Sequence, residues 1–99
     1  MDITLQYFDG CPSWRVADER LQDAVRNAAG DHRISYQKVE TEEEAERARF
    51  RGSPTILFDG LDPFAAHDAP FGLSCRIFQT ETGPQGAPSL SQLEGILES

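Results

Sequence analysis

Apolar and polar residues alternate near the start of the chain and then change to a helical spacing. Ile3, Leu5 and Tyr7 alternate with their neighbours as far as Phe8, and this pattern predicts a strand. From Pro12 to about Ala29 the apolar residues fall on one helical face, and Gly30 follows where a left-handed residue commonly ends a helix. The first thirty residues therefore predict a strand followed by a helix.

A second strand and a second helix follow. The segment Arg33–Val39 has a fair alternation of apolar and polar residues and predicts a strand. Thr41 and Glu44 have the spacing of a capping box, and we expect the helix that they begin to end at Gly52. Because a helix separates the two strands, we expect a right-handed crossover and parallel strands.

The second half of the chain predicts two strands and a helix. Ser53–Gly60 contains a short apolar run that is typical of a buried strand, and Ser74–Gln79 predicts the next strand. The loop between them, about residues 61–73, is long for a hairpin, so we regard it as a candidate functional segment. Ser89 and Gln92 cap a final amphipathic helix.

These elements predict an α/β fold with the order β-α-β-α-β-β-α and a mixed four-stranded sheet. The chain shows no internal repeat and no long linker, so residues 1–99 are expected to form a single domain. The closing pair of strands is expected to be antiparallel.

The acidic composition narrows the possible partners. The formal net charge of −8 argues against nucleic acid and anionic membranes as partners. No apolar run reaches the roughly 20 residues that span a bilayer, and the start lacks the pattern of a signal peptide. We therefore expect a cytoplasmic protein. In a reducing compartment its two cysteines are more often free or redox-active than bridged, although the sequence does not exclude a bridge.

Cys11 is the main candidate for chemistry. It lies where the first strand gives way to the first helix, and Pro12 suits the first helical position, so Cys11 is expected to be the N-cap. Unpaired N–H groups and the helix dipole at that place favour thiolate over thiol. We expect Cys11 to be the more reactive cysteine, the alternative being an inert residue.

The chain resembles the thioredoxin-like superfamily over almost its full length. The resemblance is carried by the cysteine between the first strand and first helix and by Gly-Ser-Pro-Thr at residues 52–55, which opens the third strand. It implies a three-layer fold in which Pro54 is cis and faces Cys11, with Ser53 and Thr55 flanking a substrate groove. The chain departs from the family at Trp14, where the two-cysteine motif would have its second cysteine.

The resemblance implies a thiol–disulfide redox protein, a monothiol oxidoreductase with Cys11 as the nucleophile. Its similarity to single-cysteine glutaredoxins implies glutathione as the co-substrate that resolves the intermediate, and Cys75 is the other candidate. Hairpin geometry places Cys75 at the far end of the sheet, where a small buried hydrophobic role is favoured. We expect small thiols or protein thiols and disulfides as partners, and neither a metal nor a resident cofactor.

Three alternatives remain open. Trp14 either covers the thiol as part of the substrate site or packs in the core. The fold could serve as a non-catalytic module that binds an extended peptide through the backbone of Ser53. A weaker resemblance to alkylmercury lyases implies two thiols assisted by Asp62 or Asp68, whereas a metal site with His67 matches no compact zinc pattern.

Overall fold

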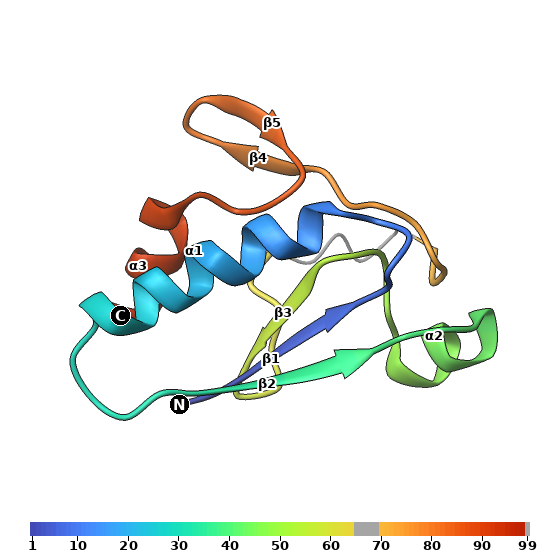
Figure 1. The fold of residues 1–99 in the computed structure, drawn as a ribbon, viewed down its shortest axis with the longest axis horizontal. Helices are drawn as coiled ribbons and strands as arrows, with labels where there is room; N and C mark the ends of the chain where they lie inside the picture. Colours follow the sequence, from blue (N-terminus) through green and yellow to red (C-terminus); the bar gives the residue numbers. More distant parts are fainter. Residues whose placement is uncertain (65–69, 99) are drawn as a thin grey trace.

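The computed structural model describes residues 1–64 and 70–98, which form an α/β fold as predicted (Figure 1). In chain order the elements are β1 (Asp2–Tyr7), α1 (Ser13–Asn27), β2 (Arg33–Lys38), α2 (Glu42–Ala48), β3 (Thr55–Phe58), β4 (Phe78–Thr80), β5 (Gly83–Gln85) and α3 (Leu90–Glu98). Within these ranges no helix has the length and apolarity needed to cross a membrane.

β1 is the central strand of a three-stranded sheet, with β2 and β3 as its neighbours. β1 and β2 are parallel, as predicted, and Ile3 lies opposite Ile34. β3 runs antiparallel to β1, with Thr55 opposite Gln6. The first residue of β3 therefore lies near the carboxyl end of β1, which is the end that leads to Cys11.

Helices α1 and α3 pack side by side over the sheet (Figure 1). Alternate residues of β1 and β3 point toward these helices, because successive side chains of a strand face opposite ways. The buried cluster consists of Ile3, Leu5, Ala17, Leu21, Ala24, Ile56, Phe58, Ala87, Leu93 and Leu97. Burial of a leucine side chain of this kind contributes about 1.5–3 kcal/mol. This core fixes the start of α1 against the end of β1.

The capping residues of the last two helices are confirmed. Thr41 Oγ1 accepts a hydrogen bond of 3.1 Å from the Glu44 N–H at the start of α2. At the start of α3, Ser89 Oγ accepts from the Gln92 N–H at 3.2 Å, and the Gln92 side chain accepts from the Ser89 N–H at 2.9 Å. Both boxes satisfy backbone donors that a helix start otherwise leaves unpaired.

Helix α2 ends earlier than the predicted Gly52. Arg49 adopts a left-handed conformation (φ 56°), and its N–H bonds back to the carbonyl groups of Ala45 and Glu46. Such a residue closes a helix, although glycine is the usual occupant. α2 lies beyond the end of β2 (Figure 1), where Ala45 packs in a second small buried cluster with Val39 and Phe50. Among the described residues, α2 is thus the only helix left to form the third layer that a three-layer fold requires.

The predicted four-stranded sheet is wrong, because residues 74–79 do not form a strand of the main sheet. Only an isolated parallel bridge joins Cys75 to Ser53. Among the described residues β3 has a ladder with β1 only, so the bridge at Cys75 does not continue along β3. The chain leaves the sheet at Ile77, and β4 pairs with β5 in a separate antiparallel hairpin. The sequence pattern did not predict β5.

Candidate functional site

Cys11 lies in the turn between β1 and α1. Its N–H donates to the Phe8 carbonyl at 3.3 Å, and the residue is completely buried. The N-cap of α1 is Pro12, so Cys11 precedes the cap by one residue, and the expectation that it is the N-cap is wrong by that residue. Cys11 still adjoins the first turn of α1, where partial positive charge favours a thiolate.

Cys75 forms a disulfide with Cys11, and their Cα atoms are 5.7 Å apart. The expectation that Cys75 lies at the far end of the sheet is therefore wrong. The chain after β3 folds back to the start of that strand instead of pairing with it as a simple hairpin, and the bridge to Ser53 is parallel. Cys75 is also exposed, so the favoured interpretation of a small buried hydrophobe is wrong as well.

Ser53 links the two cysteine segments. The Ser53–Pro54 peptide bond is cis, as predicted, and the Ser53 carbonyl oxygen lies 3.7 Å from the Cys11 sulfur. The Ser53 N–H donates to the Ser74 carbonyl at 2.7 Å, and the Ser53 carbonyl accepts from the Arg76 N–H at 2.9 Å. These backbone groups were expected to be free for an extended ligand. The chain's own segment 74–76 occupies them.

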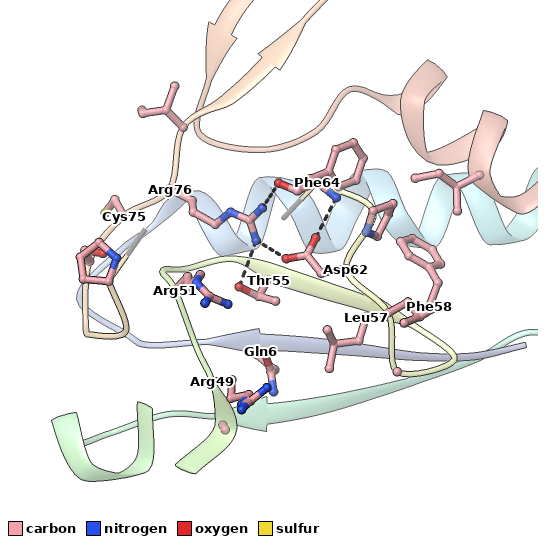
Figure 2. A pocket seen from close by; sticks show the side chains of 18 residues that line it. Gln6, Arg49, Arg51, Thr55, Leu57, Phe58, Asp62, Phe64, Cys75 and Arg76 are labelled. Atoms are coloured by element: carbon pink, nitrogen blue, oxygen red, sulfur yellow. Dashed lines mark hydrogen bonds and ion pairs between the residues drawn. The ribbon is translucent and has the colours of Figure 1, made fainter. Parts of the chain in front are cut away.

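Arg76 anchors the segment that carries Cys75, and the sequence analysis missed it. Its guanidinium donates to Asp62 Oδ2 at 2.7 Å, to Thr55 Oγ1 at 3.2 Å and to the Phe64 carbonyl (Figure 2). The Arg76 and Asp62 side chains are only 11% and 17% exposed. The sequence did contain one signal for Arg76, because a cation directly follows a cysteine in a chain with few cations.

Thr55 and Asp62 therefore have structural partners. Thr55 Oγ1 accepts from Arg76 and donates to the Gly52 carbonyl at 2.7 Å. Asp62 accepts from Arg76 through one carboxylate oxygen and from the Phe64 N–H, at 2.9 Å, through the other. Both carboxylate oxygens are thus engaged, which argues against the proton-transfer role that the alkylmercury lyase resemblance would give Asp62.

Trp14 stacks on Tyr7, with ring centroids 4.1 Å apart. It also packs against the main buried cluster and carries the Arg15 guanidinium over its ring at 5.5 Å. These contacts join the first turn of α1 to the end of β1. They support the packing role of Trp14 that the sequence left open.

The carboxylate of Asp9, near Cys11 in sequence, is paired with Lys38. Asp9, two residues before Cys11, accepts a 2.7 Å ion pair from Lys38 at the end of β2. The hydrogen bond to Asp9, together with the charge of that carboxylate, raises the pKa of Lys38 above its ordinary value. The ammonium group offsets a negative charge that would otherwise disfavour a thiolate at Cys11.

A cleft of about 1060 Å³ opens beside the disulfide (Figure 2). We call it the Cys75 cleft. It is lined by Cys75 together with residues of β1, β3, the end of α2 and the turn after β3. The lining includes the side chains Gln6, Arg49, Arg51, Thr55, Leu57, Leu61, Asp62, Arg76 and Ile77. Neither Cys11 nor Trp14 lines it, so Cys75 is the cysteine that faces this space.

His67 and Asp68, which were considered as metal or proton-transfer residues, lie outside the described residues. Across residues 1–64 and 70–98 there is no group of three or more histidine, cysteine or acidic side chains that could hold a metal ion. In comparisons with protein-family models, with curated proteins and with solved structures, no match to the chain was found.

Proposed function

We propose that this chain is a thiol–disulfide redox protein in which Cys11 and Cys75 form one exchanging pair. The observation that carries the proposal is the disulfide between them, which joins a completely buried cysteine beside a helix start to an exposed cysteine in a cleft. A purely structural bridge needs neither a cleft nor an exposed cysteine. Exchange needs both, because an external thiolate must reach one of the two sulfur atoms.

The exposure of the cysteines assigns them different roles. An external thiolate attacks Cys75 Sγ, the S–S bond breaks, and Cys11 leaves as a thiolate with the electron pair of that bond. The product is a mixed disulfide between Cys75 and the incoming thiol. The adjacent first turn of α1 stabilises the Cys11 thiolate, and a leaving thiol of lower pKa leaves faster.

A second external thiolate completes the reduction. It attacks the external sulfur of the mixed disulfide and releases Cys75 as a thiolate, so that two external thiols have become one disulfide and the protein holds two thiols. In the opposite direction, Cys75 attacks an external disulfide, and Cys11 then resolves the mixed disulfide. This cycle replaces the expectation that Cys11 is the attacking nucleophile.

The resemblance to the thioredoxin-like superfamily supports the proposal. The cis bond before Pro54 agrees with what that resemblance implies, and the cysteine that carries the resemblance follows β1. Two features depart from it. Trp14 replaces the second cysteine of the motif, and Cys75 supplies the second sulfur from a segment that is 64 residues away in sequence.

The test is to trap the mixed disulfide. Cys11→Ser, treated with oxidised glutathione, should accumulate a stable adduct on Cys75 that mass spectrometry locates by peptide mapping. Cys75→Ser is the matched control and should react far more slowly, because its remaining thiol is buried. Equal adduct formation in the two variants, or two free thiols in the air-oxidised natural chain, would overturn the proposal.

A further inference from the structure

Residues 74–76 pair with Ser53 in the way that a bound peptide pairs with a strand. The Ser53 N–H donates to the Ser74 carbonyl at 2.7 Å, and the Ser53 carbonyl accepts from the Arg76 N–H at 2.9 Å. These two bonds form an isolated parallel bridge centred on Cys75. An extended peptide that binds beside a strand makes main-chain hydrogen bonds of this kind. The chain's own segment thus occupies a place that an outside peptide could fill.

The side chain of Arg76 fills a pocket of hydrogen-bond acceptors beside that bridge (Figure 2). Its guanidinium donates to Asp62 Oδ2 at 2.7 Å, to Thr55 Oγ1 at 3.2 Å and to the Phe64 carbonyl. The guanidinium also lies over the Phe78 ring, 4.6 Å from the ring centroid. Asp62 is only 17% exposed, so its carboxylate depends on a cation in this pocket. The pocket therefore recognises a guanidinium, whichever polypeptide supplies it.

Gly52 leaves the space that this segment needs. A Cβ atom at residue 52 would lie 3.2 Å from the Ser74 carbonyl oxygen and 3.0 Å from Arg76 Cγ, which is closer than ordinary van der Waals contact. The φ of Gly52 is 129°, a conformation that also favours glycine. The backbone directly before Ser53 is therefore shaped to accept another segment of chain at close range.

Only a short stretch of chain would have to move to vacate this place. Before it, the Gly72 N–H donates to the Phe50 carbonyl at 3.0 Å, and after it, Phe78 is buried. The disulfide ties the stretch 73–77 covalently to the turn before α1. Once the disulfide is reduced, the hydrogen bonds and the ion pair of Arg76 still hold the stretch. An outside peptide can supply the same groups and replace them.

We propose that Ser53 and Asp62 form a binding site for an extended peptide that carries an arginine, and that residues 74–76 close this site until the disulfide is reduced. The main chain of the peptide pairs with Ser53, and its arginine replaces Arg76 against the Asp62 carboxylate. The partner is a protein with an exposed, extended segment that contains arginine. This inference goes beyond the proposed function and rests on it for a disulfide that external thiols can reduce.

The experiment measures the binding of a labelled peptide by fluorescence anisotropy. The probe is fluorescein-Leu-Ser-Ser-Arg-Ile-amide, which copies residues 73–77 with serine in place of Cys75, so that no thiol exchange occurs. The oxidised chain, the chain reduced with excess dithiothreitol and Cys75→Ser are compared. We expect the last two to bind the probe about tenfold or more tightly than the oxidised chain, because the disulfide no longer holds the segment in the site. A probe with glutamine in place of arginine should bind both about tenfold more weakly.

Variants in the Cys75→Ser chain test the arginine pocket. Arg76→Gln should raise the affinity for the arginine probe about tenfold, because the pocket then has no guanidinium of its own. Arg76→Lys should raise it less, and it takes the place of the glutamine variant if that variant does not fold. Asp62→Asn should abolish the preference for arginine over glutamine in the probe. Glu43→Gln is the matched control, because it makes the same change in net charge at an exposed position of α2, and it should keep the preference.

The inference and the proposed function fail in different ways. Equal affinity of Cys75→Ser for the two probes, or equal affinity of the oxidised and reduced chains for the arginine probe, would overturn the inference and leave the proposed function standing. A reduced chain that forms a dimer and does not bind the probe would assign the site to a second copy of the chain, which also overturns it. If dithiothreitol left the disulfide intact, the proposed function and the opening of the site would fail together.

Discussion

The two ends of the disulfide are held in different ways. Cys11 lies between a central strand and a long helix, and the main buried cluster fixes both. Cys75 lies in an irregular, exposed segment that is attached to β3 through hydrogen bonds to Ser53 and through the Arg76 side chain. Regular structure thus positions the buried cysteine, whereas a few polar contacts position the exposed one. The predictions below test this contrast.

The largest effect is expected from the disulfide itself. Cys75→Ser should lower the free energy of unfolding of the oxidised protein by about 4 kcal/mol, because the bridge closes a loop between residues 64 apart in sequence. Urea titrations with and without dithiothreitol measure this difference. The reductant should lower the stability of the natural chain and leave Cys75→Ser unchanged. An effect of reductant on the variant would show that the disulfide is not the source.

Removal of the Arg76 guanidinium tests the polar anchor of Cys75. Arg76→Gln should cost about 2–3 kcal/mol, because the largely buried Asp62 carboxylate loses its cation. The freed segment should also lower the effective concentration of Cys75 beside Cys11, so the disulfide should become easier to reduce in a thiol redox buffer. Alkylation followed by mass spectrometry gives the oxidised fraction.

Arg76→Lys serves as the control for that variant. It keeps the positive charge but loses the forked geometry, so it should recover part of the stability and part of the shift in oxidised fraction. A loss of stability with no change in oxidised fraction would limit Arg76 to general packing and would remove it as an anchor of Cys75.

Removal of the Trp14 ring tests the regular structure that holds Cys11. Trp14→Ala should destabilise the protein by about 2 kcal/mol through loss of the half-buried ring and its stack on Tyr7. Because Trp14 does not line the Cys75 cleft, the rate of reduction by 2-mercaptoethanol should change little. A marked change in that rate, measured with the variant still folded by circular dichroism, would return Trp14 to the substrate site.

The smallest effect is expected at Arg49. Arg49→Gly should raise the free energy of unfolding by about 0.5–1 kcal/mol, because glycine adopts its left-handed conformation without steric cost. Arg49→Ala removes the same side chain without relieving the backbone, so it should show no such gain. Equal midpoints of urea unfolding for the two variants would contradict the assigned strain.

Local pattern was enough to predict several regular elements, above all in the first half of the chain. Strand β1, helix α1 and the caps at Thr41 and Ser89 depend on residues close in sequence, and each lies within a few residues of its predicted place. The motif around Pro54 correctly predicted the cis bond. These features carry their signals in periodicity or in residues with unusual backbone preferences.

The position of Cys75 could not be predicted in that way. It depends on a long loop that returns to the start of β3 and on the pairing of Arg76 with Asp62, which no local rule connects. Residues 74–79 were predicted to form a strand, yet only β4 at the end of this segment is one, and it pairs with β5 outside the main sheet. Long-range polar contacts overrode the strand propensity of this segment.

The disulfide also divides the chain topologically. It closes a covalent ring that contains α1, β2, α2 and β3, whereas β1 and α3 lie outside that ring and pack against α1 and β3 from beyond it. A single proteolytic cut between residues 11 and 75 would therefore leave two fragments joined through sulfur. They could separate only after both the packing and the S–S bond were lost, so the redox state of the pair decides whether the two fragments stay together after such a cut.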